Sequence, residues 1–121
     1  MKLSQKERVL EHLRDAYSAE PEHLWAQYPD YGVYRHPASR KWYALIMDVP
    51  KKKLKLEGDG VAEILDIRFD PDRLAQKIDL KHFFPAYHMN KKHWITILLD
   101  GGVSPEEIFG YIDDSYQMAK K

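Results

Sequence analysis

The run from Trp42 to Val49 constrains the fold of this chain more than any other part of its sequence. Seven of its eight residues are apolar or aromatic, and Asp48 is the exception. A strand with so little polar character is buried on both faces or lies at the centre of a sheet. We therefore expect residues 42–49 to form an interior β-strand.

Other strand-like segments occur before and after this run, at residues 31–35, 61–69 and 93–99. The stretches at 36–39 and 57–60 carry proline or glycine and are typical of turns. Residues 80–90 are aromatic but irregular, and Pro85 limits them to one short edge strand at most.

Three segments have the signals of helix starts. Ser4, with Glu7 three residues later, predicts a capping box at the start of a helix over residues 4–19. Asp70-Pro71 predicts the cap and first position of a short helix. Ser104-Pro105 does the same for a last helix that runs to about Ala119, with two acidic residues in its favourable first turn.

These elements follow one another as helix, three strands, helix, one or two strands, helix. Runs of adjacent strands favour antiparallel pairing, so we predict an α+β fold: two layers, with helices packed on a mostly antiparallel sheet. The 121 residues contain no linker, repeat or low-complexity segment. We therefore predict one domain over residues 1–121.

The residue types that carry most enzyme chemistry are absent or explained by local structure. The chain has no cysteine, which excludes disulfides, iron–sulfur clusters and thiol catalysis. The neighbouring acids Glu106-Glu107 and Asp113-Asp114 point in different directions on a helix and cannot flank one bond. His88 and His93 are separated by two lysines, which repel a divalent cation. We predict a protein that is not an enzyme, with no catalytic residue, cofactor or metal site.

No stretch of the sequence resembles a targeting or membrane segment. The first six residues become polar before a signal peptide could form. The longest apolar runs, 42–47 and 94–99, are far shorter than the roughly 20 residues that span a bilayer. We expect a soluble, cytoplasmic protein without a membrane partner.

The formal net charge is zero, but the charges are segregated along the chain. Residues 35–55 contain seven basic residues against one acid, residues 57–79 sum to −4, and residues 100–114 contain five acids and no base. A basic stretch beside an aromatic strand can follow a phosphate backbone. The alternative is that these charges form a solvated surface or protect a sheet edge from aggregation.

The aromatic residues also have two interpretations. They can form a stacking platform for bases, or they can fill the core of a small sheet, which is the commoner use. The residues in question are Trp42, Tyr43, Phe83, Phe84, Tyr87 and Trp94. The stretch from Tyr87 to Lys92 is the exception, because it mixes aromatic and basic groups and is too polar for a core.

Several of these stretches together resemble the MmcQ/YjbR-like family. The most specific is Phe84-Pro85-Ala86-Tyr87-His88-Met89-Asn90-Lys91-Lys92-His93-Trp94, and the others are Tyr34-Arg35-His36-Pro37, Lys41-Trp42-Tyr43-Ala44, Leu99-Asp100-Gly101 and Asp114-Ser115-Tyr116. The resemblance covers roughly residues 24–118. Family members often carry a Lys-Cys-Asp-Pro-like stretch where this chain has Arg68-Phe69-Asp70-Pro71, so no role for that cysteine carries over.

The resemblance implies an α-β(3)-α-β(2)-α arrangement, related to secretion chaperones and loosely to frataxin. It also implies DNA binding, because the family is described as DNA-binding from its structural similarity to a double-wing motif. Fold similarity alone does not establish function.

We predict a non-enzymatic protein that binds DNA through a basic surface. The candidate contact residues are Arg35, His36, Arg40, Lys41, Lys51, Lys52, Lys53, Lys55, His88, Asn90, Lys91 and Lys92. Two alternatives remain: a protein-interaction adaptor of the secretion-chaperone type, and a binder of small anionic ligands that uses Tyr87 to Lys92 together with Arg35. The sequence leaves the oligomeric state open.

Overall fold

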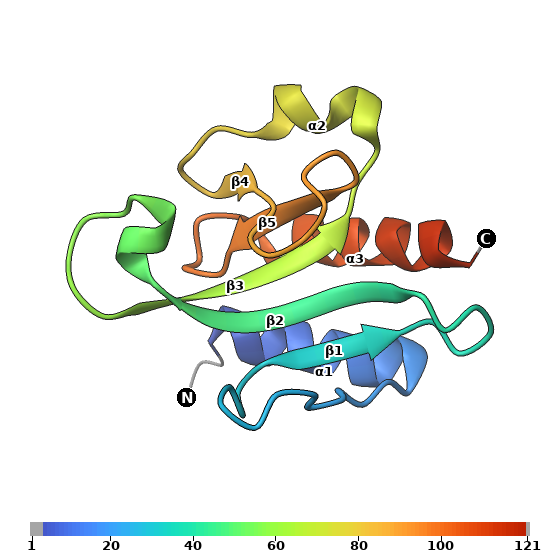
Figure 1. The fold of residues 1–121 in the computed structure, drawn as a ribbon. Coiled ribbons are helices and arrows are strands. Elements are labelled where there is room, and N and C mark those ends of the chain that lie inside the picture. The colour runs from blue at the N-terminus through green and yellow to red at the C-terminus, as the bar shows by residue number, and fades with distance from the viewer. Residues whose placement is uncertain (1–3, 121) are drawn as a thin grey trace.

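The computed structural model describes residues 4–120, so residues 1–3 and 121, at the ends of the predicted domain, lie outside the described residues. The elements are α1 (Gln5–Tyr17), β1 (Gly32–Arg35), β2 (Trp42–Pro50), the 3₁₀ helix η1 (Lys51–Leu54), β3 (Val61–Arg68), α2 (Pro71–Lys77), β4 (Phe83–Pro85), β5 (Trp94–Leu98) and α3 (Pro105–Ala119). This is the predicted α+β order, with η1 as the one unpredicted helix (Figure 1). Among the described residues, no helix is both long and apolar enough to cross a bilayer.

The five strands form one sheet in the order β1-β2-β3-β5-β4, and every neighbouring pair is antiparallel. β2 therefore lies inside the sheet between β1 and β3, as its apolar sequence predicts. Both edges carry features that block a further strand. β4 ends in Pro85, which has no N–H to donate, and β1 is met by an isolated bridge between Glu22 and Val33.

The two long helices cover one face of the sheet. α3 packs on β2 and β3, and α1 packs beside α3. In Figure 1 both helices lie behind the sheet. The core between these layers contains Val9 and Leu13 of α1, Ile108 and Ile112 of α3, and inward-facing strand residues such as Ile67. This is the helix-on-sheet arrangement expected from the sequence.

The opposite face, called the outer face here, has no long helix on it. It is nevertheless apolar, with Leu45, Met47, Ile64 and Leu98 all buried. The cover consists of η1 and of irregular chain from two other regions, residues 24–31 and 86–93, whose aromatic and methionine side chains pack against this second cluster. These irregular segments position the candidate site.

A β-bulge shapes the end of β2. Tyr34 pairs with Ala44 and Arg35 pairs with Trp42, so Tyr43 is an extra residue in β2. Tyr43 and Ala44 therefore both pack toward the helices, whereas Trp42 packs on the outer face. The bulge leaves backbone groups to be satisfied by α3: the Ser115 hydroxyl donates to the Tyr43 carbonyl (2.6 Å) and accepts from the Arg68 N–H (2.9 Å).

Candidate nucleic-acid interface

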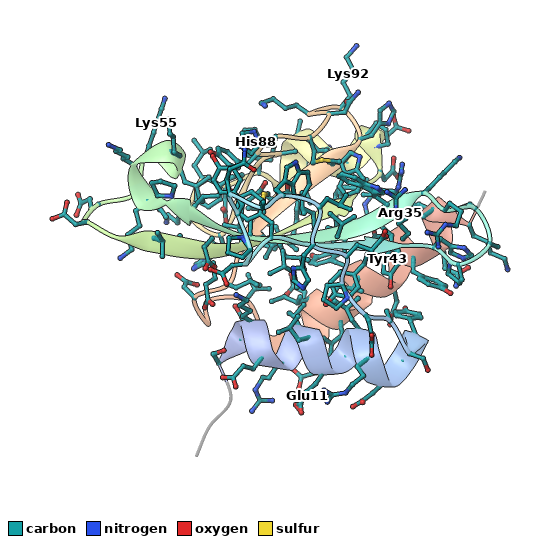
Figure 2. The ribbon with its side chains drawn as sticks, turned by 60° about the horizontal axis from the view of Figure 1, so that its bottom comes forward. Glu11, Arg35, Tyr43, Lys55, His88 and Lys92 are labelled. Carbon is teal, nitrogen blue, oxygen red and sulfur yellow. The ribbon has the colours of Figure 1, made fainter. Side chains whose placement is uncertain are left out.

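The two segments that cover the outer face are strongly basic. Residues 51–56 carry four lysines and residues 86–93 carry two, with no Asp or Glu in either segment. Figure 2 shows Lys55, His88 and Lys92 on the side of the sheet away from α1, where Glu11 is labelled. Segments separated by about 30 residues in the chain thus bring their positive charge to one face.

The η1 helix begins directly after β2 and turns Lys52 and Lys53 toward solvent, whereas Lys51 is half-buried. Leu54 is buried against the outer face and anchors the turn. Lys55 ends it in the left-handed region, with φ of 60°, and its N–H bonds back to the η1 carbonyls. Lys53 and Lys55 then line a cavity of about 330 Å³ together with Lys91 from the other segment.

Residues 86–93 form an ordered loop rather than a loose connection. The Tyr87 N–H donates to the Thr96 hydroxyl on β5 (2.9 Å), and the Lys91 ammonium donates to the Ala86 carbonyl (3.0 Å). The Asn90 side chain accepts from the Lys92 N–H (2.8 Å), which makes an Asx-type turn. Asn90, one of the predicted contact residues, therefore shapes the loop that presents Lys92 and His88.

Beside the lysine-lined cavity lies a second cavity of about 290 Å³ with aromatic walls. Trp25, Tyr28 and Tyr31 come from residues 24–31, and Trp42 comes from the start of β2. His88 and Met89 close the side toward the loop. The Tyr87 and His88 rings are 4.0 Å apart, and Tyr87 lines the lysine cavity while His88 lines the aromatic one. The two cavities are thus neighbours across one pair of consecutive residues.

Sequence reasoning did not find three of these aromatic residues. Trp42 was among the candidate platform residues, but Trp25, Tyr28 and Tyr31 were not. Tyr43, Phe83, Phe84 and Trp94 are buried in the sheet, as the core interpretation predicts. The signal that could have found them is their regular spacing: Trp25, Tyr28 and Tyr31 are three positions apart, in a stretch without the apolar pattern of a helix.

An acidic residue is buried under the basic loop. Asp66 is fully buried on β3, between Leu45 on β2 and Thr96 on β5. Its Oδ1 accepts from the Thr96 hydroxyl, while Oδ2 has no hydrogen-bond partner within residues 4–120. Burial raises the pKa of Asp66 to about 8, although the Thr96 hydrogen bond and the charge of Lys91 act in the opposite direction. The loop, Thr96 and Asp66 form one chain of hydrogen bonds from surface to sheet.

The other predicted contact residues lie elsewhere. Arg35 and Arg40 line a separate cavity of about 400 Å³ with Glu20 and Glu22, and the Arg35 side chain pairs with Glu22 at 2.7 Å. His36 is buried, and its Nδ1 accepts from the Ala38 N–H (3.1 Å) in the turn. Lys41 follows this turn and is exposed.

The predicted set therefore divides into two groups. The first, called the loop-face group here, consists of Lys51, Lys52, Lys53, Lys55, His88, Asn90, Lys91 and Lys92. The second belongs to the β1–β2 turn and is partly neutralised by acids. Arg35 and Lys91 line different cavities, but the Arg35 guanidinium also lies over the Trp42 ring, 5.7 Å from its centroid, and Trp42 shares a cavity with His88 and Met89. The small-anion alternative stays a prediction.

Part of the compensating negative charge lies in the helix layer, on α3. α3 contains Glu106, Glu107, Asp113 and Asp114 and no Lys or Arg. α1 is balanced, with three acids against three bases. The acidic stretch at residues 100–114 thus lies largely on α3, behind the sheet, whereas Glu57 and Glu63 of the stretch at 57–79 line a cavity with Lys51.

These features define the class of protein: a small α+β module with a five-stranded antiparallel sheet, helices on one face and a basic, aromatic loop layer on the other. Comparison with known proteins identifies its family. The YjbR family model matches residues 14–118, and the chain belongs to this family.

Relatives and solved structures agree with that assignment. The Bacillus subtilis protein YyaQ is 35% identical over 115 residues, which span 95% of this chain and 98% of that protein. YjbR of Escherichia coli is 46% identical over 35 residues, 29% of this chain and 30% of that protein. A crystal structure from Pseudomonas syringae has a TM-score of 0.90 at 38% identity and covers 94% of this chain and 97% of that chain. A Deinococcus radiodurans protein shares the fold, with a TM-score of 0.68 at 23% identity over 93% of this chain and 78% of that one.

Proposed function

We propose that this protein is a non-enzymatic nucleic-acid-binding module that contacts the phosphate backbone through the loop-face group. The observation that carries the proposal is that the lysines of η1 and of the 86–93 loop share one face. Lys53, Lys55 and Lys91 line the same cavity, and α3 behind the sheet carries four acids and no base. A polyanion that approaches Lys53, Lys55 and Lys91 meets a cavity whose lining contains no acid, which favours phosphate contacts.

The turn group is not part of this proposal. Arg35 is paired with Glu22, and His36 is enclosed in its turn, so neither presents an unshared charge or donor to a phosphate. The proposed contact surface is therefore narrower than the sequence prediction. The proposed surface consists only of residues in two ordered segments, residues 51–56 and 86–93.

The test is anisotropy of labelled duplex DNA at about 50 mM and about 200 mM salt, the range in which phosphate contacts lose most affinity. Wild-type protein is compared with the triple variant Lys53→Glu, Lys55→Glu, Lys92→Glu. Lys91 is left unchanged because its ammonium group holds the loop through Ala86. We expect the salt dependence (the slope of log affinity against log salt) to fall by roughly three in the variant, about one for each lost contact.

A matched control makes the same charge change in the helix layer. Arg8, Arg14 and Lys120 are all exposed, and changing them to Glu also shifts the net charge by six units. This control should keep most of the affinity. Equal losses in both variants would show that only net charge matters, and would reject a defined contact face. Absence of binding by wild-type protein at low salt would reject DNA binding altogether and leave the adaptor alternative.

A further inference from the structure

The proposed function involves only phosphate contacts and gives no role to the aromatic cavity on the outer face. Its walls are Trp25, Tyr28, Tyr31 and Trp42, and its volume is about 290 Å³. That is near the lower end of the roughly 300–1,000 Å³ typical of small-molecule pockets, so it suits one planar ring system. We infer that this cavity accepts an unpaired nucleobase by stacking, while the neighbouring lysines hold the phosphates on either side of it. This inference rests on the proposed function.

The cavity has the open rings that stacking requires. The Tyr28 and Tyr31 rings are stacked at 4.7 Å, and Trp25 meets both Tyr31 and Trp42 edge-on, at 5.9 and 6.1 Å. Tyr28, which lines the cavity, is 52% exposed. A large aromatic side chain left half exposed in a cavity wall is more typical of a binding site than of a completed core.

The surrounding charge selects the type of ring. An aromatic cavity can also hold an organic cation, but such a ligand is favoured by nearby acids, and none of the residues that line this cavity is acidic. The Arg35 guanidinium already lies over the Trp42 ring, 5.7 Å from its centroid. Lys53, Lys55 and Lys91 border the next cavity and repel a cation further. A ring attached to a negative backbone fits both cavities.

The geometry also favours single strands. In a duplex the faces of each base are covered by its neighbours, so a base has to leave the stack before it can enter a cavity. An unpaired strand offers its bases without that cost, and aromatic stacking then adds affinity that depends little on sequence. The loop-face lysines are placed to hold the strand as its base enters between His88 and Tyr28.

The experiment compares two oligomers of equal length and equal charge, oligothymidylate and its abasic analogue, by anisotropy and by tryptophan fluorescence. We expect oligothymidylate to bind about ten-fold more tightly or better, within the range known for base–aromatic stacking, and to quench tryptophan emission. Tyr28→Ala should remove most of this advantage, whereas Tyr28→Phe, which keeps the ring, should retain it. Met118→Ala, a change to an exposed apolar residue on α3, serves as the control.

The outcomes separate the two proposals. Equal affinity for the two oligomers, together with salt-sensitive duplex binding, overturns the stacking inference and leaves the phosphate-contact function standing. No binding to oligomer or duplex overturns both. Circular dichroism of each variant shows whether it is folded, and a Tyr28→Ala variant that is folded and keeps the full advantage also rejects the inference.

Discussion

Asp66 is the residue whose environment differs most from what its side chain requires. It is fully buried, and one of its oxygens has no hydrogen-bond partner within residues 4–120. Burial raises the pKa of this carboxyl to about 8, so at neutral pH the neutral form predominates. The unfolded chain exposes an ordinary aspartate with a pKa near 3.8. The folded state therefore binds this proton more tightly than the unfolded state does.

This difference predicts a dependence of stability on pH. The stabilising contribution of the Asp66 proton is complete below the unfolded pKa, near pH 4, and is lost as the pH rises through the folded pKa, near pH 8. Between about pH 5 and about pH 8, we expect the free energy of unfolding of the wild-type protein to fall by at least ~1.4 kcal/mol more than that of Asp66→Asn. This difference corresponds to a shift of one pKa unit. Urea unfolding at the two pH values measures this. Asp114→Asn removes an exposed carboxyl and should follow wild type; an Asp66→Asn curve that also follows wild type would contradict the prediction.

The sequence marks some of the individual site residues, but it does not show which of them meet in the fold. Asp66 is unusual because apolar residues flank it on both sides, and the three-residue spacing of Trp25, Tyr28 and Tyr31 marks an aromatic cluster. The meeting of residues 24–31 with His88 cannot be predicted from either stretch alone, because it depends on long-range packing over the outer face. The contacts to nucleic acid stay a prediction.

Among the elements, α3 and the bulge of β2 depend on each other. Ser115 is fully buried, and its hydroxyl satisfies both the Tyr43 carbonyl and the Arg68 N–H. It thereby connects the helix to two adjacent strands where the regular ladder is interrupted. This contact gives a physical reason for the Asp114-Ser115-Tyr116 stretch that resembles the family pattern.

We expect Ser115→Ala to lower the free energy of unfolding by about 1–3 kcal/mol, because two buried backbone groups lose their partner. Denaturant unfolding followed by circular dichroism measures the change. Gln117→Ala, an exposed position on the same helix, should stay within about 0.5 kcal/mol of wild type. A loss for Ser115→Ala as small as that of this control would show that water replaces the hydroxyl without cost.

Most of the elements were predictable because they have strong local signals. The caps at Ser4, Asp70 and Ser104 are confirmed by hydrogen bonds from their helices, and the predicted strands match β1, β2, β3 and β5 to within two residues at each end. η1 was missed, because three consecutive lysines carry no apolar periodicity. It forms because Leu54 is buried on the outer face, a contact that depends on the finished sheet.

For the molecule as a whole, the arrangement of charge matters more than its sum. The net charge is zero, yet the loop face is basic and α3 carries four acids. Neutralising Glu106 and Asp114, both exposed on α3, leaves the loop face unchanged. If the proposed function holds, the double variant Glu106→Gln, Asp114→Asn should associate with DNA faster by a factor of about 2 to 10, with an unchanged dissociation rate.

Stopped-flow association at low salt measures this rate. At about 1 M salt the screening length falls to about 3 Å, so any difference in association rate between wild type and variant should vanish there. A change confined to the dissociation rate would mean instead that α3 touches the bound nucleic acid.

The basic loop face and the acidic α3 behind the sheet give this protein a dipole moment, while its formal net charge is zero. Its field falls off faster with distance than that of a basic protein of the same size, and salt confines the field to about 10 Å at 0.1 M. A distant polyanion therefore exerts almost no net pull on the molecule. Once within range, it exerts a torque that turns the loop face toward itself and the helices away. Such a molecule would diffuse through a crowded solution with little nonspecific attraction and would meet its target already oriented.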